Sequence, residues 1–219
     1  MDPSPLTSPP TGRLEVRRLG RIGHAEALAL QTRLRDARLE GSIPDTVLFC
    51  EHPDVITFGR SSRPEHAPPE EDLRRAGYEV FRVNRGGAVT YHGPGQLVGY
   101  PILDLAARVP DIGVYLRSLE GVLIETLAEF GIEAHRRKGY TGVWVDGRRK
   151  IASIGVGVRR WVTMHGFALN VSCDLERFKP IIACGLGWAE MTSMERLVGS
   201  VELESVLERT ESQLRKVFA

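Results

Sequence analysis

Cysteine, metal-binding patterns and long apolar runs are all scarce in this chain of 219 residues. The three cysteines, Cys50, Cys173 and Cys184, are odd in number and irregularly spaced, which argues against a disulfide framework and indicates free thiols in a reducing compartment. No CxxC pair, HExxH motif or paired histidine spacing occurs, so we predict no metal site. No apolar run approaches a membrane span, and residues 1–11 lack the apolar core of a signal peptide. These absences favour a cytoplasmic protein.

An excess of charge of one sign is also missing, because 29 Lys and Arg residues balance 28 Asp and Glu residues. This balance gives no reason to expect binding to nucleic acid or to a membrane. Basic clusters do occur at 136–138, 148–150 and 159–160, and each is either a solvated face or a surface for an acidic protein partner. The Pro-, Ser- and Thr-rich start predicts a flexible tail over 1–12, followed by a single domain over 13–219.

Hydrophobic periodicity predicts a mixture of helices and strands. Apolar residues recur at helical spacing over 111–130 and are followed by Gly131, which is typical of a helix end. The turn residues Asp146-Gly147 between two apolar runs predict a hairpin of strands 143–145 and 151–158. Segment 51–69 is rich in Pro, Gly and Ser and is interpreted as a loop. Further helices are expected at 24–39, 70–76 and 201–217, and further strands at 46–50, 78–83, 88–92, 97–103 and 161–171.

The order of these elements bears on the fold class. Several strands are joined by short turns, and a strict βαβ repeat is absent. This pattern predicts an α+β fold with a mixed, largely antiparallel sheet core and flanking helices.

A glycine-rich segment, RGGAVTYHGPGQ over 85–96, differs from an ordinary loop. Adjacent glycines allow a backbone to come close to a ligand. Strand alternation places Thr90 and His92 on one face of the segment, and Val89 and Tyr91 on the other. The pattern GxxxxGK[ST] is absent, which excludes a nucleotide P-loop. A tight turn system with a satisfied histidine remains an open alternative on spacing alone.

The segment KIASIGVG follows the predicted hairpin turn. Strict alternation places Lys150 on the same face as Ile154, and places Ser153 and Gly155 on the opposite face. Lys150 therefore opens an otherwise apolar face and is partly desolvated. The alternative is a lysine at the hairpin end that extends its ammonium into water.

Among the thiols, Cys184 is the most approachable, because its neighbours in IIACGLG are small. Cys50 ends a predicted core strand, and Cys173 precedes Asp174, whose charge raises a thiol pKa. A buried, unreactive cysteine is the alternative for Cys184. His165, inside a predicted strand, is either structural or catalytic.

Taken together, four segments resemble the lipoyl(octanoyl) transferases of lipoate biosynthesis. They keep that family's order and spacing, and they read RGGAVTYHGPGQLVGYPILDL (85–105), GVWVDGRRKIASIGV (142–156), HGFALNV (165–171) and ACGL (183–186). The resemblance implies the fold of the lipoate and biotin protein ligases. It also implies a cytoplasmic acyltransferase without a cofactor, which takes octanoyl from octanoyl-acyl carrier protein. The implied acceptors are lysines of lipoyl domains, in the E2 subunits of 2-oxoacid dehydrogenases and in the glycine-cleavage H protein.

The resemblance further implies roles for individual residues. Cys184 would form an acyl thioester, and Lys150 would favour its thiolate and act as acid and base. The acyl pocket would be lined by Arg85, Gly86, Gly87, Ala88, Val89, Thr90, Tyr91, His92, Ser153, Ile154, Gly155, Gly166, Phe167 and Ala168. His165 and Asn170 are expected in supporting positions.

Three other functions stay open on the sequence. An ATP-dependent lipoate or biotin protein ligase makes an acyl-adenylate and needs no cysteine, so strict ATP dependence would identify it. An inactive acyl-protein binding module would keep its role without Cys184. A cysteine hydrolase is the fourth possibility, although no Asn or Asp partner for a Cys–His pair is identifiable in the sequence.

Overall fold

The computed structural model describes residues 13–219, so the predicted flexible tail over 1–12 lies outside the described residues. The strands are β1 (Glu15–Arg21), β2 (Thr46–Glu51), β3 (Val55–Phe58), β4 (Glu79–Arg82), β5 (Val89–His92), β6 (Gln96–Ile102), β7 (His135–Arg137), β8 (Tyr140–Trp144), β9 (Arg149–Arg159), β10 (Val162–Asn170) and β11 (Glu190–Met191). The helices are α1 (His24–Leu39), α2 (Glu70–Arg75), α3 (Ile112–Ala128), α4 (Met194–Val198) and α5 (Leu203–Phe218), with 3-10 turns η1 (Pro64–His66), η2 (Leu175–Phe178) and η3 (Ala183–Gly185).

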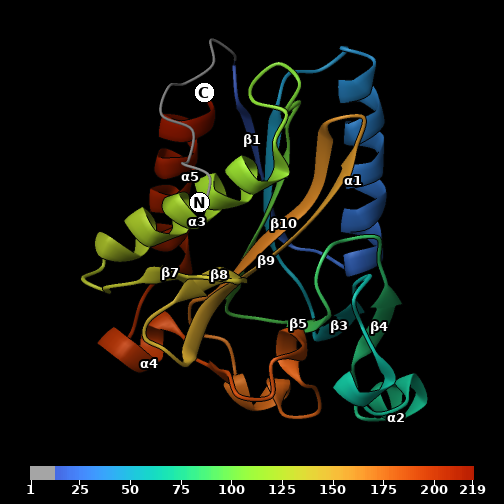
Figure 1. The fold of residues 1–219 in the computed structure, drawn as a ribbon, viewed down its shortest axis with the longest axis vertical. Helices are drawn as coiled ribbons and strands as arrows, with labels where there is room; N and C mark the ends of the chain where they lie inside the picture. Colours follow the sequence, from blue (N-terminus) through green and yellow to red (C-terminus); the bar gives the residue numbers. More distant parts are fainter. Residues whose placement is uncertain (1–12) are drawn as a thin grey trace.

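Two sheets organise these elements (Figure 1). The large sheet has the order β1-β2-β6-β10-β9-β8-β7, with β11 beside β9, and the small sheet has the order β4-β3-β5. In the large sheet β1 is parallel to β2 and β11 is parallel to β9, whereas the other neighbours are antiparallel. The predicted α+β class with a mixed, largely antiparallel sheet is therefore confirmed.

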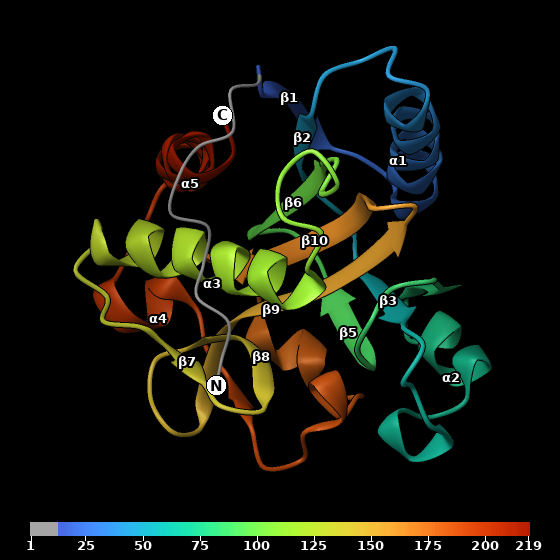
Figure 2. The ribbon, with the colours of Figure 1, turned by 45° about the horizontal axis from the view of Figure 1, so that its top comes forward.

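Alternating side chains give the large sheet two apolar faces. On β2, Phe49 packs into the cluster formed with α3 and α5, and its neighbour Leu48 packs into the cluster formed with α1. Leu97 and Val98 on β6 divide in the same way. Since successive strand residues point to opposite faces, helices must cover both sides of these strands. Figure 2 shows α3 and α5 on one side of the sheet and α1 on the other.

Most predicted elements are confirmed, and one is wrong. The helix expected over 111–130 is α3, where the Asp111 side chain accepts a hydrogen bond from Val114 N at the first turn. Segment 51–69, predicted as a loop, contains β3, which lies at the centre of the small sheet and is buried along its length. Only four residues separate its Pro- and Gly-rich flanks, so the run VITF is too short to show a period. Within residues 13–219, no helix combines the length and the apolar composition needed to cross a membrane.

Candidate active site

Cys184 and Lys150 meet at the boundary between the two sheets. Lys150 Nζ lies 3.4 Å from Cys184 Sγ, and Ser153 Oγ lies 3.6 Å from the same sulfur. The Lys150 side chain, on β9, is 2% exposed, whereas Cys184 is only partly buried. The ammonium also donates to the carbonyl of Thr141 at 3.0 Å. The alternative that Lys150 extends its ammonium into water is therefore wrong.

An irregularity in β9 brings Lys150 to this sulfur. Ala152 and Lys150 pair with adjacent residues of β8, so Ile151 is an extra residue on β9, as in a β-bulge. The bulge reverses the alternation, and Lys150 and Ser153 consequently reach the same side. The prediction that these two residues lie on opposite faces is wrong for this physical reason.

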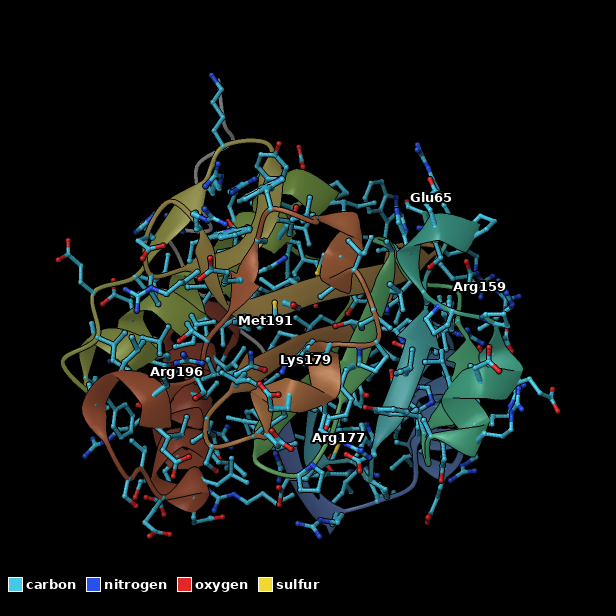
Figure 3. The ribbon with its side chains drawn as sticks, turned by 90° about the horizontal axis from the view of Figure 1, so that it is seen from below. Glu65, Arg159, Arg177, Lys179, Met191 and Arg196 are labelled. Carbon is cyan, nitrogen blue, oxygen red and sulfur yellow. The ribbon has the colours of Figure 1, made fainter. Side chains whose placement is uncertain are left out.

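The segment that carries Cys184, residues 172–192, lies across one end of the molecule. Figure 3 shows it in orange in front of the strands, with Arg177 and Lys179 labelled on it. Arg177 forms an ion pair with Asp54 beside the small sheet, and Ile182 N donates to the carbonyl of His66 at 2.7 Å. These contacts bind the segment to the small sheet and to η1 on one side of Cys184. On the other side, β11 pairs with β9 of the large sheet, where Met191 lies opposite Lys150.

The backbone at Cys184 adopts an uncommon conformation. Its φ is +59°, and that of the following Gly185 is +69°. A non-glycine residue with positive φ is strained and is held only where surrounding contacts fix it. The sequence carries a partial signal for this turn in the glycine that follows the cysteine.

The surroundings of Cys184 favour its thiolate. Burial acts to raise the pKa of the thiol, but the charge of Lys150, hydrogen bonds from Ser153 and Lys150, and the charge of Arg85 outweigh burial and lower it. Burial raises the pKa of the other two thiols, Cys50 and Cys173, to about 12. The structure therefore distinguishes one activated thiol from two unreactive ones.

A cavity of about 600 Å³ opens beside the Cys184 sulfur. The residues that the resemblance assigned to an acyl pocket and that do line this cavity are Arg85, Gly86, Gly87, Ala88, Thr90, His92, Ser153, Ile154, Gly155, Gly166, Phe167 and Ala168. Val89 and Tyr91 instead pack into the core of the small sheet, as strand alternation predicted. Asn170 accepts from Gln96 and donates to the Thr192 carbonyl, outside the cavity.

The cavity occupies a gap in the large sheet. The pairing of β9 with β8 ends at Ala152, and the next backbone hydrogen bond on that edge comes from Gly86 N to Val156 O at 2.9 Å. Between these points the 153–155 segment has no strand beside it on this edge, while its other edge pairs with β10. A Cβ on Gly155 would lie 2.9 Å from the Gly86 carbonyl oxygen, so glycine is what lets the glycine-rich segment approach so closely.

Arg85 contributes a buried positive charge to the cavity. It is 8% exposed and donates to the carbonyl and hydroxyl of Thr57, both at 2.9 Å, and to the Gly86 carbonyl at 3.0 Å. In the described part of the chain no carboxylate forms an ion pair with it. Since a buried charge without a counterion acts over a long distance, the guanidinium adds to the positive potential at Cys184.

Three histidines line the inner part of the cavity as neutral groups. Burial lowers the pKa of His24 to about 3, that of His165 to about 4, and that of His92 well below its usual value. Gln96 Nε2 already donates to Asn170, so Gln96 Oε1 must accept from His92 Nδ1. His92 Nε2 is consequently an acceptor. Sequence analysis missed His24, because its position at the start of a helix gives no such signal.

An aromatic platform forms the rim of the cavity. The Arg137 guanidinium lies 4.1 Å from the ring centre of Trp188, 5.3 Å from Tyr140 and 5.5 Å from Trp144. Tyr140 also lines the cavity. Over residues 13–219, neither Arg137 nor Lys138 is paired with a carboxylate. Arg137 and Lys138 of the predicted basic cluster at 136–138 thus present uncompensated positive charge beside the site, whereas Arg136 pairs with Glu120.

The arrangement suits covalent group transfer. It combines an activated thiol, a buried ammonium in contact with it, and a cavity that can hold a substrate chain. Within 13–219 no group of three or more His, Cys, Asp or Glu side chains is placed to hold a metal ion.

Comparisons with known proteins place the chain in a family. Residues 24–215 match the lipoyl protein ligase A/B catalytic domain. The chain is 52% identical over 204 residues to an octanoyltransferase of Solibacter usitatus, covering 93% of this chain and 92% of that one. It is 50% identical over 204 residues to an octanoyltransferase of Caldicellulosiruptor bescii, covering 91% and 89%.

Solved structures agree on the fold. A bipartite lipoate protein ligase from Thermoplasma acidophilum superposes with a TM-score of 0.70 at 18% identity, over 94% of this chain and 84% of that one. Such low identity shows the shared fold alone. The extended identity to the octanoyltransferases carries the finer assignment, and the chain belongs to the octanoyltransferase family, within the family of the lipoyl protein ligase A/B catalytic domain.

Proposed function

We propose that residues 13–219 act as one acyltransferase, which moves an octanoyl group from acyl carrier protein through a thioester on Cys184 to a lysine ε-amine of a lipoyl domain. The observation that carries the proposal is the 3.4 Å contact between Lys150 Nζ and Cys184 Sγ at the edge of the cavity. The names of the relatives support the acyl group, since they are octanoyltransferases.

The first half-reaction transfers the acyl group to Cys184. The Cys184 thiolate attacks the carbonyl carbon of the donor thioester, a new carbon–sulfur bond forms, and the carrier thiolate leaves with the proton of Lys150. One thioester replaces another of similar energy, so this step needs no ATP. Lys150 ends the step neutral.

The second half-reaction transfers the acyl group from Cys184 to the acceptor amine. The acceptor amine attacks the Cys184 thioester, its surplus proton passes to the neutral Lys150, and Cys184 leaves as the thiolate. An amide replaces the thioester, and the starting ion pair is restored. A base poised to accept this proton contributes typically 10²–10⁴-fold to the rate.

The cavity would hold the alkyl chain during both steps. Burial of each CH₂ contributes about 0.8 kcal/mol. Discrimination between chains that differ by two carbons is therefore expected to be modest. The cavity wall also contains Arg85 and three histidines, and these polar side chains do not offer burial of this kind.

The partners follow from the same proposal. The donor is octanoyl-acyl carrier protein, received on the rim where Arg137 and Lys138 expose positive charge to an acidic protein surface. The acceptors are the lipoyl domains of 2-oxoacid dehydrogenase E2 subunits and the glycine-cleavage H protein. We place the reaction in the cytoplasm. The likeness to lipoate protein ligases keeps an ATP-dependent ligase as the second candidate.

Intact-protein mass spectrometry after incubation with octanoyl-acyl carrier protein, without ATP, tests the proposal. We expect a gain of one octanoyl group that hydroxylamine removes. Cys184→Ala should gain nothing, while Cys50→Ala and Cys173→Ala should be acylated as the wild type is. Transfer to a lipoyl domain only when ATP is supplied would instead support the ligase, and equal loss in all three variants would refute the nucleophile.

A further inference from the structure

Glu120 is a buried carboxylate in the middle of α3, with an exposed fraction of 0%. Burial of an ionised carboxylate costs free energy unless the group is paired and hydrogen-bonded. Arg117 Nη1 donates to its Oε2 at 2.5 Å, and Arg136 Nε lies 3.4 Å from the same oxygen. The other oxygen, Oε1, is directed to a partner outside the helix.

That partner is the peptide unit between Thr141 and Gly142 in β8. Gly142 N donates to Glu120 Oε1 at 2.9 Å, and the Thr141 carbonyl of the same unit accepts from Lys150 Nζ at 3.0 Å. A trans peptide unit is planar, and its N–H and C=O point in opposite directions. A carboxylate at one end and an ammonium at the other therefore stabilise the same orientation, and both polarise the amide in the same sense.

Gly142 also determines the path of the Lys150 side chain. A Cβ on Gly142 would lie 2.5 Å from Lys150 Cε and 3.0 Å from Nζ. Displacement of this peptide unit would consequently displace the lysine. Across residues 13–219 no carboxylate is ion-paired with Lys150, so the negative charge of Glu120 reaches it through the peptide.

We propose that Glu120 is a positioning residue, which holds the Lys150 ammonium against Cys184 Sγ through the Thr141–Gly142 peptide unit. The inference rests on the proposed function, since it gives Glu120 a role only if the Lys150–Cys184 pair is the reacting pair. Glu120 touches neither the sulfur nor the cavity and acts entirely through Lys150.

The test measures the reactivity of the Cys184 thiol and does not depend on acyl transfer. The rate of Cys184 alkylation by iodoacetamide is followed from pH 5 to pH 10 by peptide mass spectrometry, with no acyl donor present. In Glu120→Ala we expect the apparent pKa of Cys184 to rise by about one unit, a tenfold loss of thiolate below that pKa. Glu120→Gln keeps an oxygen acceptor for Gly142 N but loses the charge, so a smaller rise is expected.

Leu123→Ala is the matched control. Leu123 is buried on the same helix in the main apolar cluster and has no polar group to bond to the Thr141–Gly142 peptide unit, so the variant loses stability by opening a cavity but should keep the wild-type profile. In a Lys150→Met background, Glu120→Gln should cause no further change, because the residue acts through the lysine.

Three results would overturn the proposal. They are a wild-type profile in every Glu120 variant that folds, an equal shift in Leu123→Ala, and a full additional shift in the Lys150→Met background. A wild-type protein that accepts no octanoyl group would refute the proposed function separately, and would leave the alkylation comparison intact.

Discussion

At the scale of single residues, the site depends on one buried lysine placed beside one thiol. The ammonium of Lys150 is within hydrogen-bond distance of the sulfur. Burial instead raises the pKa of the other two thiols, and Cys50 Sγ lies 3.7 Å from His52 Nε2. A thiol attacks a carbonyl as the thiolate, so the cation decides how much nucleophile exists at neutral pH. The proposed acyl transfer therefore depends on where Lys150 and Cys184 lie relative to each other, and not on the residue types alone.

Lys150→Met tests this placement through the pH dependence of transfer. Without the ammonium, burial of the thiol is no longer offset by its nearest cation, so the pKa of Cys184 rises and the acidic limb of the pH–rate profile moves to higher pH. At pH 7 we expect kcat/KM to fall by about 10²-fold or more, because the proton acceptor is lost as well. Steady-state transfer to a lipoyl domain between pH 6 and pH 9 measures both effects.

Lys216→Met, an exposed lysine on α5, is the control for a change of net charge. It should transfer at the wild-type rate across the whole pH range. A Lys150→Met protein with an unshifted acidic limb would show that Lys150 does not govern the thiol.

At the scale of the elements, β8 gives the lysine its place. Gly142 has φ +123° and Gly139 has φ +80°, but only a Cβ on Gly142 would meet Lys150, while a Cβ on Gly139 meets nothing within 4 Å. Alanine at either position is strained by the backbone, and at Gly142 its Cβ would also lie 2.6 Å from the Ala152 carbonyl oxygen, so Gly142→Ala should be the less stable variant. We expect Gly142→Ala to reduce acyl transfer at least tenfold more than Gly139→Ala.

Thermal unfolding of both variants separates strain from displacement. If transfer by Gly142→Ala stays below that by Gly139→Ala at a temperature where both variants are fully folded, the result would support displacement of the lysine. Equal transfer rates in the two folded variants would contradict it.

Periodicity in the sequence was sufficient for the long elements and insufficient for the short and irregular ones. The helix over 24–39 and the strands that became β6, β9 and β10 follow from their patterns. The sequence did not predict β3, because four residues are too few to show a strand period. It did not predict the bulge at Ile151, because an inserted residue does not change the composition of a strand. The cysteine and lysine were identified from motif resemblance, but their contact depends on that bulge and on a long-range approach between two sheets.

The position of Glu120 in the sequence was a signal for a buried polar contact that the sequence analysis did not use. It lies on the apolar stripe of α3, between buried Leu119 and Leu123, where a charged side chain needs a partner. A carboxylate at such a position predicts a buried cation or a backbone donor. The identity of the donor, a peptide unit of β8, depends on tertiary structure that the pattern does not contain.

At the scale of the whole molecule, four buried histidines make stability depend on pH. His24, His52, His92 and His165 come from α1, the turn after β2, β5 and β10, and burial lowers the pKa of each. The unfolded chain binds protons as pH falls below about 6.5, while the folded chain does not until pH approaches about 3 for His24 and about 4 for His165. Stability is therefore lost as pH falls through this window.

Urea unfolding at pH 7.0, 6.0 and 5.0 measures this loss. Well below pH 6.5, each such histidine should contribute a decrease of about 1.4 kcal/mol per pH unit in the free energy of unfolding. His165→Gln should reduce the slope by the share of one proton, and His135→Gln, at an exposed site on β7, is the matched substitution for comparison. An equal slope in His165→Gln and the wild type would show that His165 is not buried as a neutral group.

The division of the reacting pair between two sheets has a consequence for how the chain folds. Lys150 lies on β9 of the large sheet, and the segment that carries Cys184 is bound to the small sheet through Arg177 and to β9 through β11. The proposed reacting pair therefore forms only when this segment is docked on both sheets. Such docking requires loop closure before its contacts can stabilise the chain, which makes it slow. During refolding at mildly acidic pH, the appearance of a fast-reacting Cys184 thiol would therefore report the docking of this segment. The rate at which that thiol appears would measure the assembly of the native site.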